Sequence, residues 1–421
     1  MFDSHRKLHG VADPGKLRRH LLSCSRRNRR SCYVILTALI VLVPMLVGCR
    51  HSSSSEALQA AEYTPIPGRD WQVSTPAAQG LDPGLVAKLY RNADRLETLY
   101  SLLIIKDGRL VAEKYFHEGS IDQVSGRQSM TKSVTSALTG IALDQGCLTS
   151  VDQKMIDFFP EYRDKIMDPR KNEITIRELL QMRGGYPWEE REPPYFDRLL
   201  MSGNWHWLPH VVDVPLTSDP GTEFKYSNLT SHLLGVVVSR ACKTDLESYA
   251  QENLFSPMHA KVAKWTKDPD NYNWGFFEIY LTARDMAKFG QLYLNHGEYQ
   301  GRQLISADWV KDSLSRYSTD INFTGWFSSK LGHHFRNLGY GYQWWSADAG
   351  DHHFDFAWGH GGQLIVLLPK LNMIIITTAD PIYHLPAEQG WKYEGAIIDV
   401  VGKFIASIPN ERYVSSATSG S

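Results

Sequence analysis

The sequence predicts an α+β fold in which segments from both ends of the chain form one sheet and a mostly helical region is inserted between them. Near the N-terminal end, the stretch SLLIIKDGRLVAEKYF (residues 101–116) has two apolar runs around Lys106-Asp107-Gly108, a pattern typical of a β-hairpin. Near the other end, FAWGHGGQLIVLLP and MIIITTAD lie on either side of Leu371-Asn372 and indicate a second hairpin of strongly apolar strands. Between these regions, apolar residues recur at helical spacing.

A buried helix is expected to begin close to residue 129. Its apolar face comprises Met130, Val134, Leu138 and Ile141. Small residues that permit close packing of neighbouring elements lie at Ser133, Ala137 and Gly140, and Gly146 ends the segment. Farther along, Thr175 and Glu178 form a capping box that predicts a helix over TIRELLQM.

The composition, with 43% hydrophobic and 22% charged residues, is that of a globular protein. We expect the folded domain over residues 71–408, a helical subregion over about 145–315 and a disordered tail over 409–421. Beyond its first 48 residues the chain is net acidic, so we expect no nucleic-acid partner. We also expect neither a metal nor a cofactor. His206 and His210 have the i, i+4 spacing of metal ligands, but Pro209 would break the helix that aims both at one ion.

The first 48 residues have the layout of a secretory signal, because a basic stretch precedes an apolar run from Cys32 to Gly48. The run ends in Leu46-Val47-Gly48-Cys49, which resembles the bacterial lipobox. We therefore expect a lipid on Cys49, attachment to the bacterial cell envelope and a flexible tether over residues 49–70. By the same resemblance, Arg50 favours the periplasmic face of the outer membrane. A plain transmembrane anchor is the alternative, since the run has the minimum length for a spanning helix.

Two further cysteines, Cys147 and Cys242, lie in apolar helical contexts. They are either two small buried hydrophobic residues or the partners of one disulfide in an oxidising compartment. The sequence leaves both interpretations open.

Three short motifs are candidates for chemistry, and the first is Ser129 with Lys132 at the start of the buried helix. One helical turn separates the two residues, so the amine can reach the serine oxygen. A serine hydroxyl becomes a good nucleophile when a neighbouring base takes its proton, and burial can lower the pKa of a lysine enough for that task. Alone, the same pattern is typical of a helix cap and a solvated lysine.

The second motif, Tyr226-Ser227-Asn228, lies where a short extended piece meets a helix. A tyrosine there could take part in proton transfer if a nearby cation such as Lys132 favours its phenolate, and Asn228 could hold both Lys132 and a substrate carbonyl. The alternative is an aromatic packing residue followed by an asparagine cap.

The third motif is Gly359-His360-Gly361-Gly362-Gln363, at the start of the strand QLIVLLP. Glycines in a strand allow another backbone to approach closely, and the amide of Gln363 could complete an oxyanion hole with that of Ser129. The alternative is a β-bulge or a hairpin turn with a surface histidine.

The order and context of these motifs resemble the serine hydrolases related to class C β-lactamases, which include esterases, amidases and D-amino-acid peptidases. The resemblance covers roughly Trp71 to Ile405. It implies a β-lactamase/transpeptidase-like fold, with an antiparallel sheet flanked by helices and the active site at the junction with the helical region. It also implies that Ser129 is acylated, that Lys132 and Tyr226 share the proton transfers, and that Asn228 positions them.

The sequence departs from this family at His360, where β-lactamases and peptidoglycan peptidases carry a lysine that favours a substrate carboxylate. A histidine is mostly neutral at pH 7, although a neighbouring carboxylate could keep it charged. This departure favours an ester or simple amide, and a carboxylesterase-like hydrolase is the leading interpretation. A β-lactamase or D,D-peptidase, and a non-catalytic penicillin-binding-like envelope protein, are the alternatives. Possible pocket residues are Tyr186, Trp188 and Trp344.

Overall fold

The computed structural model describes residues 63–68, 70–195, 198–199, 203, 206–323, 330–381 and 387–410. The predicted signal segment, Cys49 and most of the predicted tail lie outside the described residues. Within the described part of the chain, no helix is both long and apolar enough to cross a membrane.

A seven-stranded antiparallel sheet in the order β2-β1-β12-β11-β10-β9-β8 forms the centre of the fold. Its strands are β1 (Leu99–Lys106), β2 (Arg109–Tyr115), β8 (Arg336–Tyr340), β9 (Trp345–Ala349), β10 (His352–Gly359), β11 (Gln363–Leu368) and β12 (Met373–Ala379). Because β1 pairs with β12, the two ends of the domain meet in one sheet, which confirms the prediction. The expected hairpin turn at Asp107-Gly108 is present, and both residues have the positive φ that such a turn requires.

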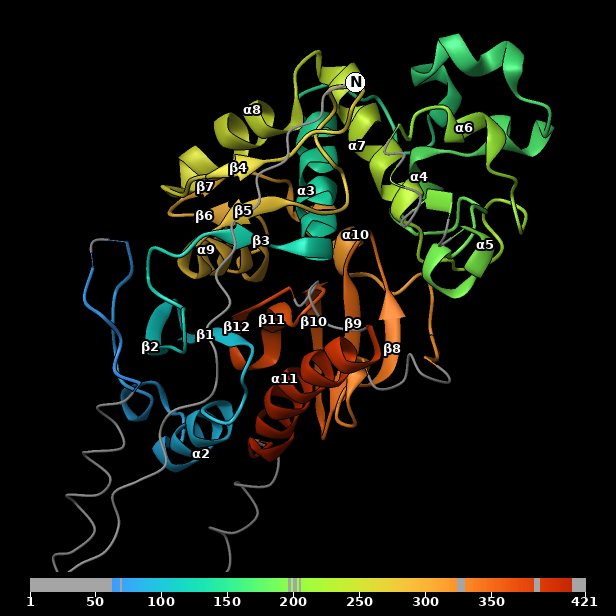
Figure 1. Cartoon of the computed structure of the whole chain (residues 1–421). Helices are drawn as coiled ribbons and strands as arrows, with labels where there is room; N and C mark the ends of the chain where they lie inside the picture. The colour runs from blue at the N-terminus through green and yellow to red at the C-terminus, as the bar shows by residue number, and fades with distance from the viewer. Residues whose placement is uncertain are drawn as a thin grey trace, which may run out of the picture. The chain divides into compact units, whose positions relative to one another are not determined.

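Alternation along the strands divides the interior into two hydrophobic cores. On β1, for example, Leu103 and Ile105 face one core, whereas Leu102 and Ile104 face the other. Helices α2 (Pro83–Ala93) and α11 (Ala387–Ser407) cover one face of the sheet, and α3 (Thr131–Asp144) and α9 (Ala283–Leu294) cover the opposite face (Figure 1).

Helix α3 is buried along almost its whole length, as its apolar and small residues predicted. It packs against α7 (Asn228–Cys242) and lies close to α10 (Ala307–Leu314). A Cβ at Gly140 would come within 2.5 Å of the Trp309 ring on α10, so only glycine permits this approach.

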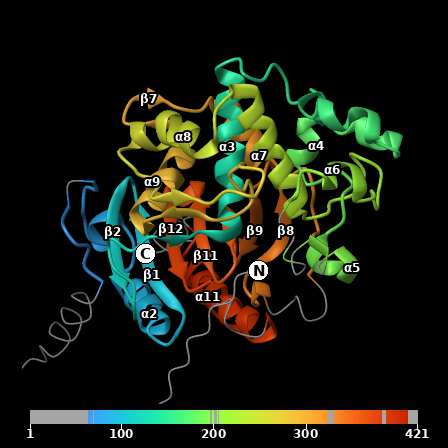
Figure 2. The same cartoon turned by 45° about the horizontal axis from the view of Figure 1, so that its top comes forward.

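The region between α3 and β8 is rich in short helices (Figure 2). Besides α7, α9 and α10, the described helices there are α4 (Ile176–Leu180), α5 (Pro193–Tyr195), α6 (His210–Asp213) and α8 (Leu246–Ala250). Two small sheets are made of short strands. In one, β5 (Ile279–Leu281) pairs with both β3 (Ser125–Gly126) and β4 (Lys264–Trp265), and in the other, β6 (Glu298–Tyr299) pairs with β7 (Arg302–Gln303). The capping box predicted at Thr175 and Glu178 begins α4.

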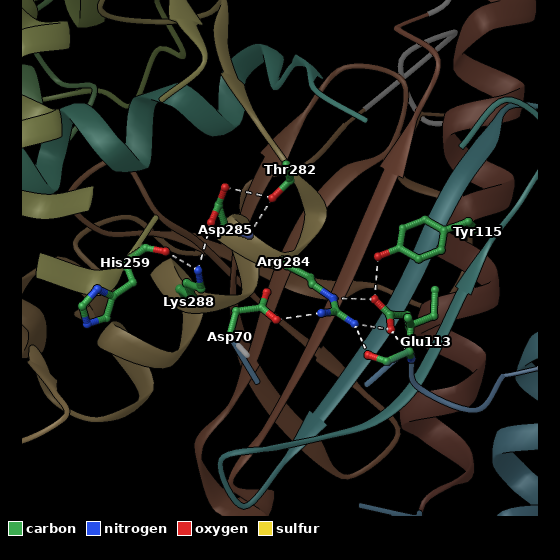
Figure 3. A network of polar contacts seen from close by, with 9 residues as sticks. Asp70, Glu113, Tyr115, His259, Thr282, Arg284, Asp285 and Lys288 are labelled. Carbon is green, nitrogen blue, oxygen red and sulfur yellow. Dashed lines mark hydrogen bonds and ion pairs between the residues drawn. The ribbon is translucent and has the colours of Figure 1, made fainter. Parts of the chain in front are cut away.

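A buried ion pair joins the segment before the domain to β2 and α9 (Figure 3). Arg284 donates to both carboxylate oxygens of Glu113 at 2.8 and 2.7 Å, and to Asp70 at 2.7 Å. The backbone N–H of Ile66 donates to the same Glu113 at 2.8 Å, and Tyr63 is buried. The predicted tether over 49–70 is therefore too long at its C-terminal end, because residues from Tyr63 onward pack on the domain.

Cys147 and Cys242 are free thiols, so the structure contains no disulfide between them. They nevertheless lie close together, and burial and the neighbouring thiol raise the pKa of Cys242 to about 12. A thiol with such a pKa is a poor nucleophile, which favours the interpretation of two packing residues.

Replacement of Arg284 with methionine should lower the free energy of unfolding by about 3–5 kcal/mol, because it leaves the Glu113 carboxylate buried without its partner. Urea unfolding of the purified protein measures the loss. The control is Arg163→Met, which removes a half-exposed ion pair with Asp157 and should cost less than about 1 kcal/mol. Equal losses in the two variants would contradict a structural role for the buried pair.

Candidate active site

Ser129 lies in a short 3-10 turn, Gln128–Met130, that leads directly into α3. Lys132 is one turn further on, and its Nζ lies 2.9 Å from the Ser129 Oγ. The structure therefore brings together the two residues of the first motif in the geometry that nucleophile activation requires.

The Lys132 amine is almost completely buried, and it contacts three parts of the chain. Besides Ser129, it is 2.8 Å from Oδ1 of Asn228 and 3.4 Å from the carbonyl oxygen of Phe276. A neutral amine has two N–H bonds for these two acceptors and keeps its lone pair for the Ser129 proton. The contacts are thus those of a general base.

Burial lowers the pKa of Lys132 to about 7, because a charged amine loses its hydration in the interior. The carboxylates of Glu190 and Glu189 oppose this shift, and the cation of Lys330 assists it. A substantial fraction of Lys132 is consequently neutral at physiological pH and able to accept a proton.

Tyr226 ends the extended segment before α7, and Ser227 caps that helix by accepting from the Thr230 N–H at 3.1 Å. Burial raises the pKa of Tyr226 above its ordinary value, although a hydrogen bond with Ser129 acts in the opposite direction. Lys132 lies over the ring face, 4.7 Å from its centroid. The expectation of a phenolate is therefore not supported, and Tyr226 is better suited to donate a proton.

The carboxylate of Glu189 is fully buried and lies at the N-terminus of α7, the helix that begins with Asn228. It accepts hydrogen bonds from Ser227 Oγ at 2.8 Å, Asn228 N at 3.0 Å and Leu229 N at 2.9 Å. Burial nevertheless raises the pKa of Glu189 to about 7. Sequence reasoning missed this residue, because only the fold brings it to the start of α7.

Gly361 and Gly362 of the third motif lie in the turn between β10 and β11 rather than within a strand, whereas Gly359 is the last residue of β10. Gly361 and Gly362 have φ values of 86° and 99°, which other residues rarely adopt. Close approach of another backbone occurs instead at Gly359, where a Cβ would come within 2.3 Å of the Arg127 carbonyl oxygen. The strand end is thus in contact with the turn that carries Ser129.

His360 faces a carboxylate, which is one of the two possibilities that the sequence left open. Its Nδ1 is 2.7 Å from Oε2 of Glu394, which also accepts from Gly361 N at 3.0 Å. Burial alone would raise the pKa of Glu394, but Lys330 and His360 outweigh it and hold that pKa below its ordinary value. Glu394 therefore stays ionised and fixes both the turn and the imidazole.

The side chain of Gln363 is buried, and it joins the Ser129 turn to the sheet. Its Oε1 accepts from Arg127 at 3.1 Å, and its Nε2 donates to the Ala379 carbonyl at 2.6 Å. Arg127 is itself fully buried, two residues before the nucleophile. The oxyanion role of the Gln363 backbone amide remains a prediction.

The Ser129 side chain lines a small pocket of about 30 Å³, which has room for one or two water molecules. Its other lining residues are Trp188, Glu190, Tyr226, Phe323, Lys330, Trp345, Trp358 and His360. Trp188 was expected there. Tyr186 and Trp344 lie in the hydrophobic core instead: the Tyr186 hydroxyl donates to the Val211 carbonyl, and Trp344 packs on Tyr293 of α9.

Lys330 corrects the expectation that the site lacks a fixed positive charge. Burial alone would lower its pKa, but the charges of Glu190 and Glu394 raise it above the ordinary value. Its Nζ lies 3.6 Å from Glu190 and 5.3 Å from the centroid of the Trp358 ring. The segment that precedes β8 thus contributes a cation to the pocket.

Comparison with known proteins places this geometry in context. The sequence profile of the Beta-lactamase family matches residues 93–380. The chain is 23% identical to the 6-aminohexanoate-dimer hydrolase of Paenarthrobacter ureafaciens over 318 residues, which are 71% of this chain and 77% of that protein.

Two solved structures share the fold. One is EstCE1, a hydrolase with promiscuous acyltransferase activity, with a TM-score of 0.57, 15% identity and coverage of 76% of this chain and 100% of the other. The other is the octameric penicillin-binding protein homologue from Pyrococcus abyssi, with a TM-score of 0.55, 18% identity and coverage of 75% and 76%.

The pH dependence of Ser129 labelling tests the role of Lys132. The rate of reaction with a fluorophosphonate probe should rise with pH around a midpoint of about 7, because the neutral amine is the base. Lys132→Met should slow labelling about 10²- to 10⁴-fold. Mass spectrometry of the adduct measures both effects.

The matched control is Lys171→Met, which removes another buried lysine that lies over the ring of Tyr186 and should leave the labelling rate unchanged. A midpoint close to the ordinary lysine pKa of about 10.4 would contradict the assignment.

Proposed function

The chain belongs to the Beta-lactamase family and is a serine hydrolase, and from the pocket around Ser129 we propose that it cleaves carboxylic esters with short, uncharged acyl groups. The observation that carries the proposal is the combination of an aromatic wall with paired charges. Trp188, Trp345 and Trp358 supply apolar surface, while Lys330 faces Glu190 and His360 faces Glu394. A substrate carboxylate would have to displace one of these carboxylates, whereas a neutral acyl group would not.

The proposed reaction proceeds through an acyl-enzyme. Lys132 takes the proton of Ser129 as the oxygen attacks the carbonyl carbon, and the Ser129 and Gln363 amides stabilise the oxyanion. Collapse of the tetrahedral intermediate breaks the ester bond, and the leaving alkoxide takes a proton from Tyr226, which recovers it from the Lys132 ammonium. The same amine then deprotonates a water molecule, which attacks the acyl-enzyme carbonyl. The bond to Ser129 Oγ breaks, the acid leaves, and Oγ regains its proton from the Lys132 ammonium.

Linear amides are the second candidate class of substrate. The specific observation in their favour is the similarity to a hydrolase that is named for the 6-aminohexanoate dimer and aligns with 71% of this chain. Amide cleavage requires protonation of the leaving nitrogen. Tyr226 carries a proton at neutral pH, because burial raises its pKa, and it lies within hydrogen-bond reach of Ser129 to supply that proton.

We also propose that the enzyme is anchored in the bacterial envelope by a lipid on Cys49, on the periplasmic face of the outer membrane. The support is the sequence Leu46-Val47-Gly48-Cys49 after a basic and then apolar segment.

Cells that express the full chain should incorporate labelled palmitate into it and release the protein from membranes only with detergent. Cys49→Ala should abolish incorporation, whereas Cys24→Ala, which replaces another cysteine in the same N-terminal segment, should not. A plain transmembrane anchor predicts membrane association without palmitate in all three proteins.

A substrate panel tests the proposed activity. Purified protein should hydrolyse p-nitrophenyl butyrate faster than a linear p-nitroanilide, and a chromogenic cephalosporin slowest. Ser129→Ala should lower kcat/KM by at least about 10³-fold, because the acyl-enzyme can no longer form. Ser120→Ala, at an exposed turn, is the control and should retain full activity.

Preferential turnover of the cephalosporin would favour a β-lactamase. Absence of turnover, together with absence of covalent labelling of Ser129, would favour a binding protein.

A further inference from the structure

We propose that Glu189 is a positioning residue of this site: its buried carboxylate fixes the first turn of α7, so that Asn228 holds the Lys132 amine against Ser129. The inference deepens the proposed function and rests on it, since it concerns the same base and nucleophile. Glu189 does not itself line the pocket, although its chain neighbours Trp188 and Glu190 do, and the hydrogen bonds of its carboxylate go to the start of α7 rather than to Ser129.

The geometry joins Glu189 to Lys132 through a single residue. The backbone N–H of Asn228 donates to Glu189 at 3.0 Å, and the side-chain Oδ1 of Asn228 accepts from Lys132 at 2.8 Å. Any shift of the first turn of α7 therefore moves the acceptor that orients the amine. Catalytic groups must be held within about 0.5 Å of their productive geometry. The contact between Asn228 and Lys132 therefore determines whether the amine is correctly placed.

Capping of the helix alone does not account for a buried carboxylate here. Ser227 already caps α7 through the Thr230 N–H, and its own hydroxyl donates to Glu189. Taking a carboxylate fully out of water has a high free-energy cost, which neutral side chains at ordinary helix caps avoid. The three hydrogen bonds and the helix dipole offset part of that cost. The result of this arrangement is that Asn228 is held in a fixed position.

The charge of Glu189 also acts on the base. The charged and titratable groups around Lys132 are Glu189, Glu190 and Lys330, with the Tyr226 phenol against its side chain. The two carboxylates favour the protonated amine, and Lys330 opposes it. Because its own pKa is about 7, Glu189 is ionised in only part of the molecules near neutral pH. Loss of that partial charge should make Lys132 somewhat easier to deprotonate while loosening its position.

The test is Glu189→Gln, which keeps the length of the side chain but replaces one acceptor oxygen with an NH₂ group that faces an N–H donor. With p-nitrophenyl butyrate, kcat should fall about 10- to 100-fold because the amine is displaced, while KM changes less than about twofold. The acidic limb of the kcat/KM profile should move to lower pH. Glu189→Asp keeps the charge and should leave that limb in place.

The matched control is Glu178→Gln, which removes the carboxylate that caps α4 through the Thr175 N–H at 2.7 Å. Both Gln variants should lower the melting temperature, but only Glu189→Gln should change kcat and the pH profile. If the two variants behave alike in both readouts, Glu189 is a structural cap and the proposal is wrong. A rise in KM with kcat unchanged would also overturn it.

Failure of the proposed ester activity would be recognised separately, because the rate of Ser129 labelling by a fluorophosphonate needs no substrate. Wild type that labels without hydrolysing any ester would refute the ester assignment alone, and the Glu189 proposal would then be judged on labelling rates and their pH dependence. Should Glu189→Gln fail to fold, Glu189→Asp must still show slower labelling than wild type at an unchanged midpoint, or the proposal is wrong.

Discussion

The burial of the Lys132 amine is the constraint on which the site depends. An amine withdrawn from water needs partners, and here they come from three separate parts of the chain: the Ser129 turn, the start of α7 at Asn228, and the segment that contains Phe276. Close packing of α3 against α7 brings Lys132 and Asn228 together. The burial that lowers the pKa of the Lys132 amine thus requires the surrounding fold.

A second consequence of burial is that charge around Lys132 is closely balanced. Glu190 and Glu189 favour the ammonium, while desolvation and Lys330 favour the amine. These interactions are strong because little solvent screens them, so their sum decides whether Lys132 is neutral near pH 7. Lys330 is itself kept protonated by Glu190 and Glu394, which means that the cation needed to assist Lys132 is maintained by carboxylates on two other elements.

Local patterns sufficed to predict the hairpins, the buried helix and the capping box, because each follows from the spacing of neighbouring residues. The assembly of one sheet from both chain ends followed from the order of these elements along the chain. The residues that line the pocket were harder to predict from the sequence. Trp344 lies in the core and Trp345 lines the pocket, a difference of one position that only the strand register decides. Glu189, Lys330 and Glu394 have no local signature, since each is defined by partners distant in sequence, such as His360 for Glu394.

In the related motif, one lysine would both occupy the turn after β10 and supply the positive charge. In this chain, two different residues have these roles. In this chain the turn after β10 carries His360, which is committed to Glu394 together with Gly361, so the turn is held by a carboxylate from α11. The positive charge comes instead from Lys330, before β8, where Glu190 faces it. A cation that is already paired with one carboxylate binds a second carboxylate less strongly. The proposed preference for uncharged acyl groups therefore rests on the aromatic surface of Trp188, Trp345 and Trp358 more than on net charge.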